Sequence, residues 1–525
     1  MWMVPWVLAS VSGLVQISLF PRFSCFFFAW IMLVPLLWAL ERSRPWKGFF
    51  VSLYFGLLSA AGVAYWLYHA VTGYFRVSPW IALPLMLSIH LLTAAVYFGL
   101  FGLAASALRK HFQSLYALLW LPSLWVVCEW LRARMATRDP WMLLGYSQHE
   151  QLGLIQIADL TGVYGVSFLI VMMNVGLYQI LSHFVAIPRG CGRLRRRLLL
   201  WRTLIPTLAL AGAWLYGHAR LEQFRTGAGC DPHSAAPCVR VAVVQANVPS
   251  QFRWKSIFHG KTLEIYLRAS LPALADPDLD LLVWPENALH FHPDREPLYL
   301  RFITSALRRG HAALVTGAPR MEQGPAGEER FHNSVFLITA SGIRQVYDKI
   351  ALLPLSEDKD LWPFRLLGPH GEAPSQFVAG RDPVVFDGPA GKFSTPICFE
   401  MIYPEHVRRF VRAGATYLLN LSNDSWFGVT AGPPQHLIYS VFRAIENRRH
   451  VVRATSTGIS AFVEPTGEIS QHSALNEAAV LSGRVRPLEV RTAYAAWGDA
   501  FVGLCLAIVA GGLLLVRRKG ALVSS

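Results

Sequence analysis

The chain has 525 residues, of which 53% are hydrophobic and only 15% are charged, whereas soluble domains carry about 25% charged residues. These proportions exclude a single soluble globule, and the polar segments exclude a chain made only of membrane helices. The net charge of +15 does not indicate nucleic-acid binding, because the densest basic run, residues 189–202, lies between two apolar segments. Basic residues there set membrane topology and meet anionic lipid headgroups.

About eight apolar segments are long enough to cross a bilayer, which takes a helix of about 20 residues. Only Pro21 and Arg22 separate the first two segments. We do not expect a cleavable signal peptide, because no basic region precedes the first segment and another apolar segment follows at once. The eight segments are residues 4–20, 23–40, 49–69, 80–107, 114–131, 154–181, 199–217 and 495–516.

The distribution of lysine and arginine predicts the orientation, because these residues collect in short cytoplasmic loops. With the N-terminus inside, the inner loops carry the basic residues of 42–47, 109–110 and 189–202, and the tail carries those of 517–519. The outer short loops carry fewer. The long loop of residues 218–494 is then outside, which is the periplasm of a bacterium with two membranes.

These patterns predict three parts in a multi-pass membrane protein, which in a bacterium with two membranes lies in the inner membrane. Residues 1–220 form a membrane domain of about seven helices, and residues 221–490 form a water-facing domain, periplasmic in such a bacterium. Residues 491–525 form a last membrane helix with a basic cytoplasmic tail.

The loop between the apolar segments at 114–131 and 154–181 has two interpretations. It carries charged residues from Arg132 to Asp139, then Trp141, and then Gly145-Tyr146-Ser147-Gln148. It is either an ordinary polar loop with interfacial aromatic residues, or a loop that touches lipid headgroups or shapes the entrance to an active site. The sequence leaves both open.

From residue 239 the pattern changes to short apolar strands that alternate with amphipathic helices. This alternation predicts an α/β domain in which helices cover a sheet. The predicted strands are 239–245, 279–284, 312–317, 333–339, 342–347, 392–397, 416–421, 451–455 and 459–463, and the predicted helices are 256–275, 404–413 and 434–449.

Three chemically active side chains lie where predicted strands end, which is where catalytic groups gather in such sheets. Glu286 and Lys349 each follow a strand, and Cys398 lies between a strand and a helix. Taken singly, they are more simply a turn glutamate, a solvated lysine and a packed cysteine. Together they favour acyl transfer, because a cysteine nucleophile needs a base for its proton and a cation for the oxyanion.

The other cysteines give no sign of a metal site, since no CxxC or Cys/His spacing is present. Cys25, Cys128 and Cys505 lie in apolar segments and are interpreted as packing residues. Cys230 and Cys238 would pair only if their segment is extracytoplasmic, and the sequence leaves this open. We expect no metal and no organic cofactor.

Several segments resemble a known family. Trp284-Pro285-Glu286, Tyr347-Asp348-Lys349 and Ile397-Cys398-Phe399-Glu400 are similar to the Glu–Lys–Cys signature of the nitrilase, or carbon–nitrogen hydrolase, superfamily, which implies an α-β-β-α sandwich. The segments at 145–148, 162–165, 245–249, 353–357, 420–428 and 455–460 resemble the apolipoprotein N-acyltransferase family. The resemblance covers almost the whole chain.

The resemblance implies a role for each matched residue. Glu286 would be the general base, Lys349 the oxyanion stabiliser and Cys398 the nucleophile. The other implied roles are support of the triad by Glu357 and Glu400, and substrate binding by Trp254, Trp426 and Phe399. Two departures stand out: Phe399 replaces a frequent tyrosine, and Pro434 replaces a tryptophan in Gly432-Pro433-Pro434-Gln435-His436.

The resemblance further implies two membrane-anchored substrates. A phospholipid, typically phosphatidylethanolamine, gives its sn-1 acyl chain to Cys398 as a thioester, and the N-terminal amine of a diacylglyceryl-cysteine lipoprotein receives it. Apolar flaps near Trp254, residues 362–364 and residues 426–427 would keep water away. An alternative is a membrane-tethered amidase or nitrilase-type hydrolase, which leaves eight spans unexplained. A transporter would need ionisable residues in the spans, of which His90 is the clearest.

Overall fold

The computed structural model describes residues 3–135, 138–141, 143–185, 193–227, 238–248, 252, 255–324, 327–353, 357, 377–389 and 391–521. The chain divides into two compact units. The first comprises residues 1–72, 76–222 and 497–525, and the second comprises residues 73–75 and 223–496.

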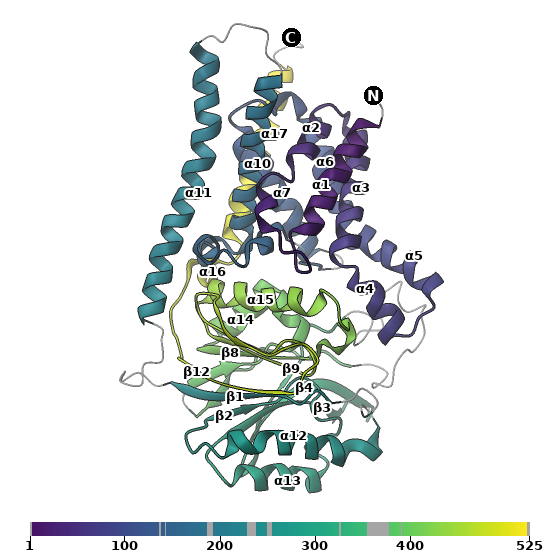
Figure 1. The fold of residues 1–525 in the computed structure, drawn as a ribbon, viewed down its shortest axis with the longest axis vertical. Coiled ribbons are helices and arrows are strands. Elements are labelled where there is room, and N and C mark those ends of the chain that lie inside the picture. Colours follow the sequence, from purple (N-terminus) through teal and green to yellow (C-terminus); the bar gives the residue numbers. More distant parts are fainter. Residues whose placement is uncertain are drawn as a thin grey trace. The chain divides into compact units, whose positions relative to one another are not determined.

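The first unit is helical (Figure 1). Helices satisfy every interior backbone hydrogen bond within one segment, which an apolar surrounding requires. Its elements are α1 (Val4–Ser18), η1 (Phe26–Trp30), α2 (Val34–Glu41), α3 (Pro45–Val63), α4 (Trp66–His69), η2 (Ala70–Tyr74), α5 (Pro79–His90), η3 (Leu91–Ala95), α6 (Val96–Ala107), η4 (Arg109–His111), α7 (Ala117–Arg134), η5 (Leu144–Gln148), α8 (Leu152–Ile155), α9 (Ala158–Thr161), α10 (Val163–Val185), α11 (Arg193–Gly227) and α17 (Ala500–Ala521).

Within the described residues, four helical stretches are long and apolar enough to cross a membrane by length and composition: Pro45–Val63, Pro79–Ala107, Val163–Val185 and Arg197–Arg225. Shorter apolar helices span Val4–Ser18, Phe26–Glu41, Leu152–Thr161 and Ala500–Gly512. The protein therefore has a helical part suited to a membrane.

Two predicted spans differ from the helices observed. The segment predicted at 154–181 is divided, because Gly162 has a φ of 64° and separates α9 from α10. The segment predicted at 23–40 begins with η1 and a turn before α2. Asn174 on α10 stabilises that turn: its amide donates to the carbonyl of Ala29 and accepts from the N–H of Leu33, both at 2.8 Å.

The second unit contains two six-stranded sheets (Figure 1). The first has the order β12-β1-β2-β3-β4-β5 and the second the order β11-β10-β9-β8-β7-β6. The strands are β1 (Val239–Gln245), β2 (Leu281–Val283), β3 (Ala313–Gln323), β4 (Glu329–Thr339), β5 (Gly342–Asp348), β6 (Phe386–Gly388), β7 (Gly391–Ser394), β8 (Tyr417–Ser422), β9 (Val451–Thr455), β10 (Ala461–Val463), β11 (Ile469–His472) and β12 (Ala479–Val485).

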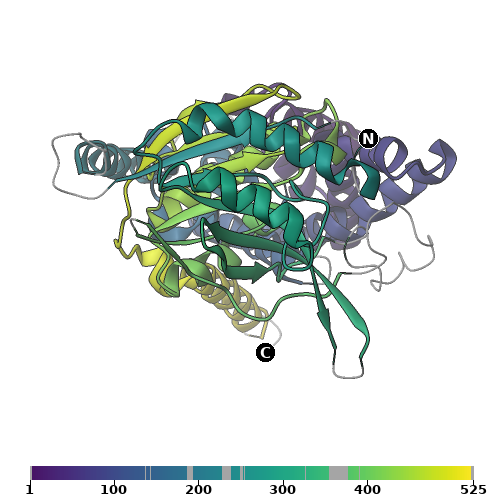
Figure 2. The same cartoon turned by 90° about the horizontal axis from the view of Figure 1, so that it is seen from below.

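Helices cover the outer face of each sheet, so that the unit is an α-β-β-α sandwich. Figure 2 shows α12 (His259–Leu274) and α13 (Pro297–Leu307) in front of the first sheet, and Figure 1 shows α14 (Pro404–Arg412) and α15 (Gly432–Asn447) over the second. The strand β8 is buried along its whole length, as expected of a strand with both faces covered. The alternation of strands and helices in the sequence predicted a single sheet covered by helices. The two-sheet sandwich is the fold that the family resemblance implied.

The core between α12, α13 and the first sheet fixes the strand end that carries Glu286. Trp284, which is 0% exposed, lies in this core and donates through Nε1 to the hydroxyl of Ser270 on α12 at 2.9 Å. The next residues turn sharply against β3, where the N–H of Gly317 donates to the carbonyl of Pro285 at 3.1 Å.

Gly317 has no room for a side chain, because a Cβ there would lie 2.6 Å from the Cα of Glu286. We therefore predict that Gly317→Ala displaces the Glu286 turn and lowers the free energy of unfolding by about 1–3 kcal/mol, the usual cost of overpacking. Thermal unfolding of the purified protein in detergent measures this.

The matched control is Gly260→Ala on α12, where the nearest atom to the new Cβ is 3.8 Å away. Alanine is a better helix former than glycine, so this variant is expected to be at least as stable as the parent. A Gly317→Ala protein with the parent's melting temperature would contradict the close approach described here.

Candidate active site

Glu286, Lys349 and Cys398 come together at strand ends of the two sheets. Glu286 follows β2, and Lys349 follows β5 in the same sheet, whereas Cys398 follows β7 of the second sheet and begins η9 (Cys398–Ile402). All three are buried, with exposed fractions of 3%, 1% and 3% in that order. Cys398 has a φ of 50°, a backbone conformation that non-glycine residues adopt rarely and that is enriched at active sites.

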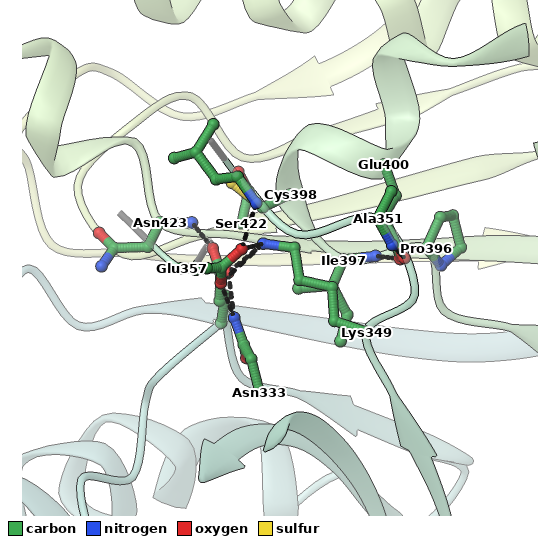
Figure 3. Close-up of polar contacts among 12 residues, drawn as sticks. Asn333, Lys349, Ala351, Glu357, Pro396, Ile397, Cys398, Glu400, Ser422 and Asn423 are labelled. Atoms are coloured by element: carbon green, nitrogen blue, oxygen red, sulfur yellow. Dashed lines mark hydrogen bonds and ion pairs between the residues drawn. The ribbon is translucent and has the colours of Figure 1, made fainter. Parts of the chain in front are cut away.

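The ammonium of Lys349 lies between two carboxylates (Figure 3). Its Nζ is 3.1 Å from Oε1 of Glu286 and 2.8 Å from Oε2 of Glu357. Asn333, on β4, donates from Nδ2 to the same two groups, at 2.8 Å to Glu286 and 2.6 Å to Glu357. Glu357 thus lies in direct contact with the ammonium of Lys349.

The second sheet also holds Glu286. The N–H of Asn423, directly after β8, donates to Oε2 of Glu286 at 2.7 Å. The hydroxyl of Ser456 donates to the carbonyl oxygen of Glu286 at 3.3 Å. The carboxylate therefore receives hydrogen bonds on both oxygens, and its orientation is fixed by groups from both sheets.

Glu400 connects the turn that carries Cys398 to the segment that follows Lys349. Its carboxylate accepts from the N–H of Ile397 at 2.7 Å, and from the N–H groups of Ile350 and Ala351 at 2.8 and 2.9 Å (Figure 3). The hydroxyl of Tyr347 donates to the same carboxylate at 2.8 Å. Glu400 touches neither Lys349 nor the thiol in these contacts, so it acts on the site through the backbone.

The donors around Glu400 keep it ionised although it is 0% exposed. Burial alone would raise the pKa of Glu400, but the neighbouring His406 and the backbone N–H groups hold the pKa below its ordinary value. A buried carboxylate with this many donors is a rigid anchor rather than a proton donor.

The charges in the site favour a charged lysine and a protonated thiol. Burial alone would lower the pKa of Lys349, but the carboxylates of Glu286 and Glu357 outweigh burial and hold that pKa well above its ordinary value. Burial raises the pKa of the Cys398 thiol, and the charge of Glu286 raises it further. Burial also raises the pKa of Glu286, against the charge of Lys349. The site therefore pairs a protonated thiol with a carboxyl group whose affinity for protons is increased.

A second buried network adjoins the segment that carries Cys398. The amide of Asn420 donates to the carbonyl of Pro396 at 2.8 Å, and Arg453 donates to the side-chain oxygen of Asn420. Arg453 also forms an ion pair with Asp424 at 2.8 Å, and Asp424 accepts from the hydroxyl of Ser422 at 2.8 Å. Burial alone would raise the pKa of Asp424, but Arg453 holds it well below its ordinary value.

Other predicted residues are distributed around the triad. Trp426 is half-buried and stacks on Phe427 with ring centroids 3.8 Å apart. Phe399 is half-buried, edge-to-face with Tyr403 at 5.7 Å. Pro434 lies in the first turn of α15, where a missing N–H costs no helical hydrogen bond. Trp254 and the predicted flap at 362–364 lie outside the described residues.

Sequence reasoning missed Asn333, because an asparagine at the start of a predicted strand has no signature of its own. It included Asn423 and Asp424 in the resembling segment at 420–428 without giving either a role, and it did not consider Arg453. In the part of the chain that the structure describes, no group of His, Cys, Asp or Glu side chains is arranged to hold a metal ion. Cys238 is disulfide-bonded, and its partner lies outside the described residues. The pairing of Cys230 with Cys238 therefore stays an alternative that the sequence leaves open.

Comparison with known proteins identifies the family. Residues 12–176 match the apolipoprotein N-acyltransferase N-terminal domain, and residues 240–494 match the carbon-nitrogen hydrolase domain. The apolipoprotein N-acyltransferase of Geobacter metallireducens is 37% identical over 98% of this chain and 96% of its own length. That of Shewanella oneidensis is 31% identical over 97% of this chain and 94% of its own length.

Solved structures are more distant. Saccharomyces cerevisiae Nit3, a member of branch 10 of the nitrilase superfamily, is 19% identical with a TM-score of 0.37 and covers 48% of this chain and 90% of its own. A mutant of the Nesterenkonia AN1 amidase, also of the nitrilase superfamily, is 19% identical with a TM-score of 0.39 and covers 51% of this chain and 98% of its own.

The relatives match along nearly their whole length, and both domain models match where the helical and the sandwich units lie. The chain belongs to the apolipoprotein N-acyltransferase family, whose members are N-acyltransferases of lipoprotein biosynthesis.

Proposed function

We propose that the protein transfers the sn-1 acyl chain of a phospholipid, phosphatidylethanolamine in the first place, through a thioester on Cys398 to a lipoprotein. The acceptor is the N-terminal amine of a diacylglyceryl-cysteine. The observation that carries the proposal is the buried cluster in which Lys349 lies 3.1 Å from Glu286, with Cys398 buried close enough for the charges of both groups to act on the pKa of its thiol.

In the first half-reaction Glu286 takes the thiol proton while the sulfur attacks the ester carbonyl. A C–S bond forms, and the charge that develops on the carbonyl oxygen is stabilised by the ammonium of Lys349. The C–O bond of the ester then breaks, and Glu286 returns the proton to the departing oxygen. The products are a thioester on Cys398 and a lysophospholipid.

In the second half-reaction the neutral α-amine of the lipoprotein attacks the thioester. A C–N bond forms, Glu286 accepts the amine proton, and the C–S bond breaks. The proton then passes to the sulfur, which restores the thiol. Because a thioester is more reactive than an amide, the ping-pong sequence needs no further energy source and no cofactor.

The remaining predicted residues have positioning or binding roles in this proposal. Glu357 holds Lys349 through the contact at 2.8 Å, and Glu400 holds the backbone on both sides of the site. We assign Trp254, Trp426 and Phe399 to substrate binding at the apolar entrance. A hydrolase of the amidase type shares the triad, but the family of this chain is one of acyltransferases, and its apolar helices support a reaction between membrane-anchored substrates.

We further propose that residues 1–220 and 491–525 form a membrane domain with about eight spans, and that residues 221–490 form a catalytic domain in the periplasm of an inner-membrane protein. The basic residues of the short loops support this orientation. A disulfide at Cys238 is consistent with an oxidising compartment. Placement at the outer leaflet would bring the site to both lipid substrates.

We predict a fatty-acyl mass on Cys398 after the purified enzyme is incubated with phosphatidylethanolamine alone. Mass spectrometry of the digested protein locates the adduct. Glu286→Gln is expected to slow its formation by about 10²–10⁴-fold, the usual contribution of a general base. Addition of a diacylated lipopeptide with a free α-amine should remove the adduct.

Cys398→Ala is expected to carry no acyl group, and Cys128→Ala, which removes another buried cysteine, is the matched control that should keep it. An intact, folded enzyme that gives triacylated lipopeptide without any adduct on Cys398 would refute the covalent route.

Asn333 provides a pH-dependent test. Burial raises the pKa of Glu286, whereas the hydrogen bond from Asn333 lowers it. Since the base is active only when deprotonated, Asn333→Leu should raise this pKa and move the acid limb of the profile of kcat/KM to higher pH. Activity should be lost most at low pH and should recover in part as pH rises.

The matched control is Gln345→Leu on β5, an amide that donates to the carbonyl of Val385 and accepts from the N–H of Asp387, away from the triad. Its acid limb should coincide with that of the parent. A uniform loss of activity at every pH in Asn333→Leu would assign Asn333 to folding alone.

For the orientation, a reporter enzyme that works only outside the cytoplasm is fused after residue 225, near the end of α11 (Arg193–Gly227). We predict activity of this fusion, and no activity of a fusion after residue 110, in a predicted inner loop. The reverse pattern would overturn the loop-charge argument.

A further inference from the structure

The turn that carries Cys398 has a strained backbone that its neighbours hold in place. Cys398 has a φ of 50°, which costs free energy in a residue with a side chain and persists only where the surroundings enforce it. Glu400 holds the turn from one sheet edge, since it accepts from the N–H of Ile397 at 2.7 Å. A parallel bridge between Ile397 and Leu421 places the same turn against β8. The side chain of β8 that reaches the turn is Asn420.

The side-chain amide of Asn420 spans the backbone around the nucleophile. Its Nδ2 donates to the carbonyl of Pro396 at 2.8 Å and to the carbonyl of Cys398 at 3.5 Å. The first carbonyl precedes the Cα of Cys398 and the second follows it, so one amide group contacts the chain on both sides of the thiol. Asn420 is 0% exposed, and a buried amide keeps the partners that satisfy it.

Arg453, on β9, determines which way this amide points. Its guanidinium donates to Oδ1 of Asn420, and a guanidinium has donors only. An amide turned the other way would place its NH₂ group against these donors and its oxygen against two carbonyl oxygens. Arg453 therefore excludes the turned amide and directs Nδ2 of Asn420 at the turn of Cys398.

The charge of Arg453 is balanced within the same network. Arg453 is 0% exposed and pairs with Asp424 at 2.8 Å. Asp424 also accepts from the hydroxyl of Ser422 at 2.8 Å, and its Oδ1 lies 3.0 Å from Nδ1 of His436. An arginine with a buried counter-ion can hold a fixed position without leaving a lone charge in the interior.

The thiol of Cys398 is exposed to charges from both sheets. Burial raises the pKa of this thiol most, and the charge of Glu286 raises it further, whereas Lys349 lowers it. Asp424 adds a smaller increase to the same pKa. The network of Asp424 and Arg453 is therefore close enough to the nucleophile to affect its chemistry.

We propose that Asn420 is a positioning residue for the nucleophile and that Arg453 orients it. The amide holds the turn so that Sγ of Cys398 stays within reach of Glu286, which takes the thiol proton in the proposed reaction. Both residues act through the backbone of the turn rather than through contact with a substrate. This role rests on the proposed function, because position matters where Cys398 reacts.

The full-length enzyme with Asn420→Leu, which keeps the size of the side chain and removes the donor, tests the role. Acylation of Cys398 by phosphatidylethanolamine is followed over time by mass spectrometry. At saturating lipid we expect the rate constant to fall about tenfold to a hundredfold, as for a misplaced reacting group. The half-saturating lipid concentration and the final acylated fraction should equal those of the parent. A lower final fraction with the parental rate constant would assign Asn420 to folding alone and overturn the proposal.

Alkylation of Cys398 by iodoacetamide gives a second measurement that needs no lipid. The sulfur displaces iodide, and near neutral pH the thiol depends on Glu286 to take its proton. Asn420→Leu should therefore react more slowly than the parent at neutral pH. The difference should narrow as pH rises, because the thiol then ionises without the base. If the parent forms no acyl adduct, the proposed function fails, and this pH profile still decides the role of Asn420.

The matched control is Asn447→Leu on α15. It removes another asparagine that is 0% exposed, whose amide donates to the carbonyl of Arg443 in the same helix at 3.0 Å. Both rate constants of this control should equal those of the parent. Parental rate constants in Asn420→Leu, for acylation and for alkylation at every pH, would overturn the role of Asn420.

The double variant Arg453→Met/Asp424→Asn tests the orientation of the amide. It removes the guanidinium together with its counter-ion, so that no buried charge is left alone. Because nothing then fixes the amide of Asn420, acylation should be slowed as in Asn420→Leu. A folded double variant that is acylated at the parental rate would show that Asn420 is oriented without Arg453 and would overturn the role of the arginine.

Discussion

The site depends on one buried ammonium. Lys349 is 1% exposed and faces two carboxylates, Glu286 at 3.1 Å and Glu357 at 2.8 Å. Removing a charge from water costs several kcal/mol, so the lysine remains charged only while both partners stay in place. Asn333 donates to both carboxylates and reduces the repulsion between them. Because each of these groups requires the others, loss of one partner leaves an uncompensated charge in the interior.

This cluster also joins the two sheets. Glu286, Asn333 and Lys349 come from the first sheet, whereas the N–H that orients Glu286 belongs to Asn423, next to β8 of the second. Glu400 makes the reverse connection, since it follows β7 and accepts from the N–H groups after β5. The packing of the two sheets therefore also assembles the site, and a change in that packing moves Glu286 relative to Cys398.

The sequence was sufficient to select Glu286, Lys349 and Cys398 as side chains that come together, because each stands where an apolar strand gives way to a turn; their catalytic roles stay a prediction. It was insufficient for Asn333 and Arg453, which lie within strands and look like ordinary polar positions until their partners are known. It also missed β12, whose pairing with β1 joins residues 239–245 to 479–485 and is invisible to local patterns. The predicted span at 154–181 is divided because Gly162 has a positive φ. The apolar composition of the segment does not predict this backbone conformation.

A raised pKa for the nucleophile agrees with the compartment that we propose. A low-pKa, exposed thiolate is the form that oxidants attack, and the periplasm is kept oxidising. Burial and Glu286 raise the pKa of Cys398, and the residue is 3% exposed. In the proposed reaction the thiol is therefore protected at rest, and it gains nucleophilic character only when an ester carbonyl lies beside Lys349 and Glu286 takes the proton. On this proposal the same buried charges that hold the site together reserve its reactivity for a bound acyl donor.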